Sequence, residues 1–141
     1  MQTETVKLTK ENRQRTLDRA VRIIKSGGLV VFPTETVYGL GANAEDQQAV
    51  KKIFIAKGRP SDNPIIVHIA TLEQLSKLTD HISSLEQKLI DIFWPGPLTI
   101  IFQKNKNVPD VVSGGLDTVA ARMPSHPFAH DLILSAGVPI A

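Results

Sequence analysis

Short apolar segments alternate with amphipathic segments along the whole chain, and this alternation constrains the fold more than any other feature. Continuous apolar runs between Gly- or Pro-containing breaks predict strands, at 29–32, 65–70, 98–103 and 118–122, with a further strand starting at 138. Apolar residues at helical spacing predict helices, at 10–26 with Thr9 as N-cap, at 46–56 with Asp46 as N-cap, and at 72–79, 84–93 and 127–137. Such alternation is typical of a mixed α/β layer structure.

The 141 residues are 42% hydrophobic and contain no repeat, low-complexity tract or linker, so residues 1–141 are predicted to belong to a single domain. The last residues, Val138–Ala141, are uncharged and have the pattern of a buried strand, whereas a natural terminus is usually polar. We therefore expect the chain to stop inside its domain.

Cysteine is absent, which excludes disulfides, thiol nucleophiles, iron–sulfur clusters and sulfur-ligated zinc. The first ten residues contain no hydrophobic block, and the longest apolar runs are too short to span a bilayer. A cytoplasmic protein without a membrane partner is expected.

Sixteen basic and fourteen acidic residues leave a net charge of +2, too small to indicate a nucleic-acid binder by itself. The first predicted helix carries Arg15, Arg19 and Arg22 opposite its apolar side. This stripe is either a solvated face or an RNA contact, and the residues alone leave both open.

Two loops have the composition of ligand sites. In the first, Lys57 and Arg59 stand two residues apart around Gly58, between a helix and an apolar strand, which predicts an anion site; a solvated basic turn is the alternative. The second, 33–41, follows the first strand with hydroxyls and a carboxylate, and its threonines either bind a ligand or cap backbone groups. Within it, 39–44 matches G-x-G-x-x-A, but the preceding strand ends at Phe32, so no dinucleotide site is predicted.

Two polar residues interrupt apolar strands. His68 is either a satisfied core residue or a ligand-binding group. Arg122 ends its strand and needs a partner, either a bound carboxylate or phosphate or an acid such as Glu35. His126 and His130 have a spacing that can chelate zinc, but no glutamate follows the first, and Pro127 favours His126 as an N-cap, so no metal site is predicted.

Five motifs in one order resemble the threonylcarbamoyl-AMP synthase family, which has a YrdC-like fold. The resemblance runs from about Val21 to Ala141. The motifs are Phe32–Leu40, Lys57–Pro60, Asn63–Pro64, Trp94–Thr99 and Arg122–Pro124. The resemblance implies an open, twisted mixed β-sheet with flanking helices around a large basic cavity.

The resemblance also implies an activity: condensation of L-threonine, bicarbonate and ATP to threonylcarbamoyl-AMP and pyrophosphate, for threonylcarbamoyladenosine modification of tRNA. It implies ATP contacts from Lys57, Arg59, Asn63 and Thr118, with Lys57 and Arg59 as the catalytic pair. Threonine contacts are implied for Thr36, His68 and Arg122. Mg²⁺ is expected to be bound to the ATP phosphates when ATP enters the site, and no metal site on the protein is expected. The implied partners are tRNA and downstream tRNA-modification proteins.

The chain departs from the family pattern at its end, because the strand beginning at Val138 should lead into a Ser-Ala-Asn loop that completes the nucleotide pocket. We expect the chain to hold the N-terminal part of the site, and the chain by itself need not be active. An RNA-binding module without catalysis, for tRNA or double-stranded RNA, is the alternative function.

Overall fold

The computed structural model of the chain describes residues 2–141, and each element below is taken from that part. The helices are α1 (Arg13–Lys25), α2 (Gln47–Lys57), α3 (Leu72–Leu75), α4 (Ser84–Phe93), α5 (Asp110–Ser113) and α6 (Pro127–Ala136). The strands are β1 (Val30–Phe32), β2 (Gly39–Gly41), β3 (Ile66–His68), β4 (Ile100–Gln103) and β5 (Thr118–Arg122). The predicted α/β class is confirmed.

Helix starts follow side-chain caps that the sequence indicates. Asp46 accepts hydrogen bonds from the backbone N–H of Gln48 and Ala49 at the start of α2. His126 accepts one from Phe128 at the start of α6, which confirms its predicted role as an N-cap. These caps satisfy backbone donors that have no partner inside the helix.

The predicted start of the first helix is wrong. Thr9 and Asn12 exchange reciprocal hydrogen bonds, 2.8 Å from Thr9 N to Asn12 Oδ1 and 3.2 Å from Asn12 N to Thr9 Oγ1. These bonds hold a turn in front of the helix, so α1 begins only at Arg13. Its arginine stripe is exposed as expected, and Arg19 pairs with Glu4 at 2.5 Å.

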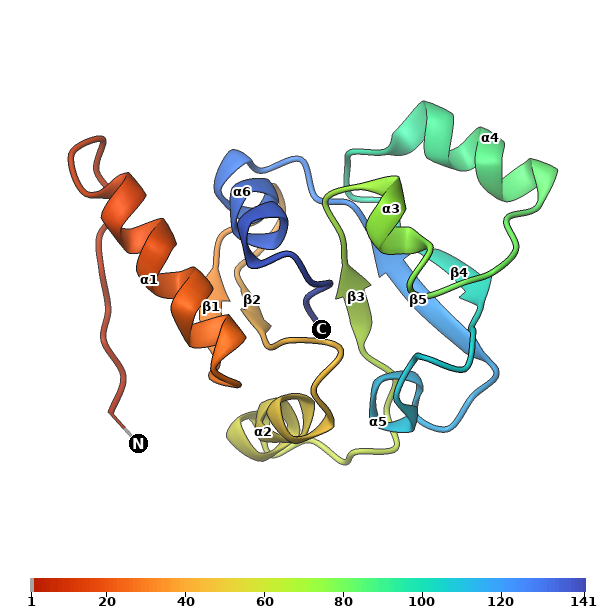
Figure 1. The fold of residues 1–141 in the computed structure, drawn as a ribbon, viewed down its shortest axis with the longest axis horizontal. Helices are drawn as coiled ribbons and strands as arrows, with labels where there is room; N and C mark the ends of the chain where they lie inside the picture. The colour runs from red at the N-terminus through yellow and green to blue at the C-terminus, as the bar shows by residue number, and fades with distance from the viewer. Residues whose placement is uncertain (1) are drawn as a thin grey trace.

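The strands form two sheets joined by the end of the described chain. β1 and β2 are antiparallel, and in the second sheet, of order β3–β5–β4, β5 is parallel to β3 and antiparallel to β4. Ile140 forms an antiparallel bridge to Asn43 on one side and to His68 on the other. The C-terminus therefore lies between β2 and β3 (Figure 1) and makes the strand layer continuous. The result is the expected open, mixed sheet.

Three elements differ from their predictions. The sequence Gly39-Leu40-Gly41 has low strand propensity and predicts a loop, but the structure has β2 there. Backbone hydrogen bonds to β1 stabilise the strand in spite of its low propensity. α3 ends at Leu75, although a helix to 79 was predicted. The single turn α5 was not predicted, since four residues carry too little periodicity.

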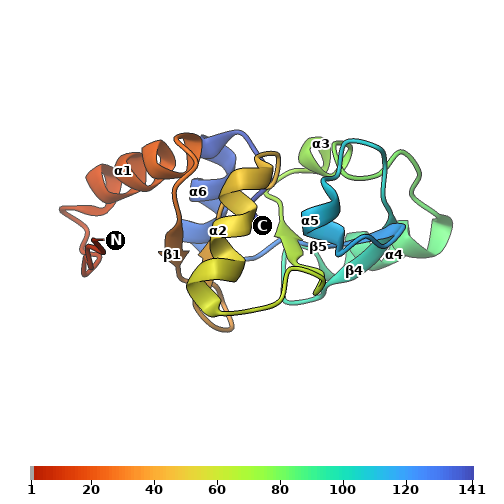
Figure 2. The ribbon, with the colours of Figure 1, turned by 90° about the horizontal axis from the view of Figure 1, so that it is seen from below.

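Three of the six helices described within residues 2–141 lie on the same side of the strand layer. Figure 2 shows α1, α3 and α5 above the strands, while the opposite face of β4 and β5 has no helix over it. Val67, Val119 and Ala121 point to the helix side and are buried in the core. Ile66 and Ile101 point to the other side and remain 42% and 63% exposed. Within residues 2–141, no helix combines the length and the apolar character that crossing a membrane requires.

Candidate functional site

The uncovered face of the strand layer carries the polar residues that the sequence singled out. His68 and Arg122 are register partners in the parallel pair β3–β5, so their side chains leave the sheet on the same face. Both stand at the carboxyl ends of their strands, the edge where open α/β sheets bind ligands.

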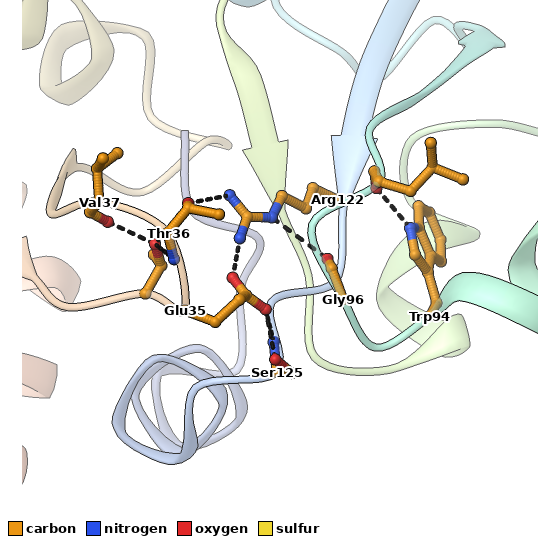
Figure 3. A network of polar contacts seen from close by, with 9 residues as sticks. Glu35, Thr36, Val37, Trp94, Gly96, Arg122 and Ser125 are labelled. Carbon is orange, nitrogen blue, oxygen red and sulfur yellow. Dashed lines mark hydrogen bonds and ion pairs between the residues drawn. The ribbon is translucent and has the colours of Figure 1, made fainter.

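Arg122 is held from three directions (Figure 3). Its Nε donates to the carbonyl oxygen of Gly96 at 3.3 Å, and its Nη1 donates to Oγ1 of Thr36 at 3.3 Å. Its Nη2 forms an ion pair with the carboxylate of Glu35, although this buried nitrogen is not aligned for a hydrogen bond. Burial lowers the pKa of Arg122. Of the two alternatives for its partner, the structure contains the Glu35 pair.

Glu35 links this arginine to a second loop. Its Oε2 accepts hydrogen bonds from both the backbone N–H and the hydroxyl of Ser125, each at 2.5 Å. The Glu35 side chain is 21% exposed and that of Arg122 11%. The 33–38 loop, β5 and the start of α6 are thus joined through one carboxylate.

His68 packs against a buried aromatic ring, Phe32, and its backbone pairs with that of Arg122. The imidazole packs edge-on against Phe32, with ring centroids 6.1 Å apart and an interplanar angle of 86°. Burial lowers the pKa of His68, and the backbone carbonyls of Ile66 and Ile140 act in the opposite direction to a smaller extent. A neutral imidazole can accept a hydrogen bond as well as donate one.

The predicted ATP residues lie at the other end of the same strands. Lys57 is the last residue of α2, and Gly58 follows it in the left-handed region with φ of 60°. Arg59 and Asn63 are exposed on the loop that leads into β3, and Arg59 Nη2 donates to the carbonyl oxygen of Pro64 at 3.1 Å. Thr118 begins β5 on the same face as Arg122, about 13 Å away along an extended strand.

The predicted site residues therefore form two groups. The carboxyl-end group comprises Thr36, His68 and Arg122, and the structure brings its members together. The amino-end group comprises Lys57, Arg59, Asn63 and Thr118: the first three lie at the end of α2 and on the loop that leads into β3, and Thr118 begins β5, without a direct contact between Thr118 and the other three in the structure.

Two residues near Arg122 were not predicted. Gly96 contributes its carbonyl oxygen to Arg122 and its N–H to Met123, at 2.8 Å, and Ser125 binds Glu35. Both lie within or next to the motifs Trp94–Thr99 and Arg122–Pro124. Motif proximity was the only sequence signal for them, since a backbone carbonyl leaves no residue signature.

The described surface has a hollow beside the amino-end group and another on the helix side of the strand layer. A groove of about 690 Å³ runs between α2 and α5, with Lys51, Arg59, Asp62 and Asp110 as its charged side chains. A second hollow of about 340 Å³ on the helix side is rimmed by the Lys77–Glu45 ion pair, of 3.1 Å, and contains none of the predicted site residues. A single large basic cavity stays a prediction. Residues 2–141 contain no group of three or more His, Cys, Asp or Glu side chains placed to hold a metal.

Comparisons with known proteins agree with the motifs. The family profile Sua5_yciO_yrdC, described as "Telomere recombination", matches residues 22–141. A protein named threonylcarbamoyl-AMP synthase from Pyrococcus abyssi is 55% identical over a match of 133 residues that covers 92% of this chain and 39% of that protein. One from Bacillus subtilis is 52% identical over 124 residues, 87% of this chain and 36% of that protein.

A solved structure has the same fold. The crystal structure of P. abyssi Sua5 complexed with L-threonine superposes with a TM-score of 0.88 at 55% identity, covering 91% of this chain and 38% of that one. The chain thus spans less than two fifths of the length of these relatives. The profile match and the shared fold show that the chain belongs to the Sua5/YciO/YrdC family.

Proposed function

We propose that the protein carrying this chain is a threonylcarbamoyl-AMP synthase, with L-threonine at the carboxyl-end group and ATP at the amino-end group. The observation that carries the proposal is the fixed position of Arg122, a buried cation bonded to the Thr36 hydroxyl, with His68 as its register partner on the same face of the sheet. The names of the relatives and the L-threonine in the Sua5 structure support it.

Arg122 offers what an amino acid carboxylate needs. A guanidinium has five N–H donors on three nitrogens. In Arg122 each nitrogen has one partner, Gly96 for Nε, Thr36 for Nη1 and Glu35 for Nη2, so these contacts do not use all five donors. Because Nη2 is buried, the second N–H of Nη1 is the donor that we assign to the threonine carboxylate, in a charge-assisted contact of about 1.5–3 kcal/mol. Thr36 and neutral His68 then lie within the same group to bind the threonine hydroxyl or amine.

The reaction needs alignment and charge neutralisation more than a strong base. The threonine amine and bicarbonate combine to a carbamate with loss of water. An oxygen of this anion attacks the α-phosphorus of ATP, the bond to the β-phosphate breaks, and pyrophosphate leaves. We assign Lys57 and Arg59 to the negative charge on the phosphates, with Asn63 and Thr118 beside the nucleotide and Mg²⁺ arriving with ATP as part of that substrate. The product is passed on for tRNA modification.

Titration of L-threonine into the full-length gene product tests the assignment. The wild type should bind, and Arg122→Ala should weaken binding by roughly 10- to 100-fold, the equivalent of one charge-assisted contact. Arg13→Ala is the matched control, because Arg13 pairs with Asp131 at 2.7 Å outside both groups. Absence of L-threonine binding, or an Arg122→Ala variant that binds like wild type, would overturn the assignment.

A further inference from the structure

The loop of Lys57–Pro64 packs against the end of α5 at one glycine. Gly114 ends α5 with φ of 62°, and its backbone is so close to the loop that a Cβ there would lie 2.6 Å from the carbonyl oxygen of Asp62. The same Cβ would lie 3.1 Å from the nitrogen and 3.2 Å from the Cδ of Pro64. The loop backbone thus occupies the space that any other residue at 114 needs for its side chain.

Two hydrogen bonds connect the contact at Gly114 to the side chain of Arg59. The N–H of Ile65 donates to the carbonyl oxygen of Val112 in α5 at 2.9 Å, which fixes the end of the loop to the same helix. Arg59 Nη2 donates to the carbonyl oxygen of Pro64 at 3.1 Å. A shift of Pro64 away from α5 therefore moves the acceptor that orients the Arg59 guanidinium.

We propose that Gly114 is a positioning residue: it lets α5 hold the backbone of Asp62–Pro64 in place and, through Pro64, sets the orientation of Arg59. The proposal rests on the proposed function for one point only, that the anion bound by Arg59 is a nucleotide phosphate. Gly114 itself contacts no substrate.

The next residue provides a matched control. Gly115 also has a positive φ, of 79°, but a Cβ there would meet no heavy atom within 4 Å. Alanine at either position carries the strain of a left-handed backbone, whereas only alanine at 114 pushes against the loop. A difference in ligand affinity between Gly114→Ala and Gly115→Ala therefore reports the displacement of the loop, because the backbone strain is common to both variants.

The first measurement is titration of a non-hydrolysable ATP analogue and of L-threonine into the full-length gene product and both variants. Gly114→Ala should weaken analogue binding by about ten-fold or more, because small displacements of a binding group cost much of its effect, and leave the L-threonine affinity within about two-fold. Gly115→Ala should leave both affinities within about two-fold. Equal losses of analogue binding in the two variants, or no loss in Gly114→Ala, would overturn the proposal.

Amide hydrogen exchange without nucleotide separates this proposal from the proposed function. Gly114→Ala should speed exchange at Ile65, whose N–H is bonded to Val112, and Gly115→Ala should not. If Gly114→Ala does not fold, Pro64→Ala tests the contact from the loop side by removing the Cδ next to Gly114, and exchange at Ile65 should again rise. Unchanged exchange at Ile65 would refute the positioning role, whereas a wild type that binds no ATP analogue would refute only the proposed function.

Discussion

The two ends of the β3–β5 strand pair hold cations in opposite ways. At the carboxyl ends, Arg122 is buried and fixed by Gly96, Thr36 and Glu35. At the amino ends, Lys57 and Arg59 are exposed, and Arg59 has a single hydrogen bond to a backbone oxygen. Removing one partner of a buried ion pair leaves an uncompensated charge and destabilises the fold, whereas removing an exposed charge costs little. The predictions below test this difference through the free energy of unfolding.

The largest expected effect is that of Arg122→Ala. The substitution removes two hydrogen bonds and leaves the partly buried Glu35 carboxylate without its cation. We expect the free energy of unfolding to fall by about 2–3 kcal/mol, measured by urea denaturation at pH 7.

Arg13→Ala is the control for this loss. Arg13 also pairs with a carboxylate, that of Asp131, but the two side chains are 37% and 39% exposed. Its replacement should cost about 1 kcal/mol or less. Similar losses in Arg122→Ala and Arg13→Ala would contradict the distinction between the two ends of the strands.

The next effect is a pH dependence carried by His68. Its pKa is lowered in the folded state by burial, so below pH of about 6.5 the unfolded chain binds a proton that the folded chain resists. Stability from this group is complete above that pH and is lost as the pH falls below the unfolded pKa and through the lower folded pKa, with a slope of at most about 1.4 kcal/mol per pH unit. Urea denaturation between pH 7.5 and 5 measures the slope.

His68→Gln should remove this component of the slope, and the exposed His81 provides the matched substitution His81→Gln. An unchanged slope in His68→Gln would show that His68 is not the group that destabilises the fold in acid.

A smaller effect is expected for Glu35→Gln. The amide oxygen can still accept from Ser125, so the change removes the charge and keeps the shape. We expect a loss of about 1 kcal/mol. In a double-mutant cycle with Arg122→Ala, the two losses should couple by at least about 0.5 kcal/mol, because the residues are in direct contact. Additive losses would mean that the ion pair contributes nothing to folding.

Much of the fold was predictable because local signals and tertiary structure agree. β5 has the predicted bounds, Thr118–Arg122. Its apolar residues, Val119–Ala121, form a run too short for a helix, and the segment lies between the breaks at Gly115 and Pro124. α2 begins after its predicted cap, Asp46. β2 was not predictable, because Gly39 and Gly41 have no strand propensity and acquire their conformation from pairing with β1. The bridge of Ile140 to both sheets depends on contacts distant in sequence.

The carboxyl-end group was predictable in its residues but not in its contacts. An arginine closing an apolar strand indicates that a partner exists, and Glu35 was one of the alternatives. Sequence gives no means of choosing between a side chain and a ligand, because that choice depends on where the 33–38 loop folds. Gly96 binds Arg122 through its backbone carbonyl oxygen, and Ser125 binds Glu35 partly through its backbone N–H. Every residue type has these backbone groups, so the sequence does not identify which residues use them.

The smallest expected change in stability is that of Lys57→Ala. Lys57 is exposed at the end of α2, so its loss should alter the free energy of unfolding by less than about 0.5 kcal/mol in urea denaturation. If Lys57 binds phosphate, the same variant should still weaken binding of the non-hydrolysable ATP analogue by about ten-fold, the scale of one charged contact. Lys88→Ala, at an exposed position of α4, should change neither quantity. A stability loss comparable to that of Arg122→Ala would show that both ends of the strand pair hold their cations alike, and unchanged analogue binding would remove Lys57 from the nucleotide site.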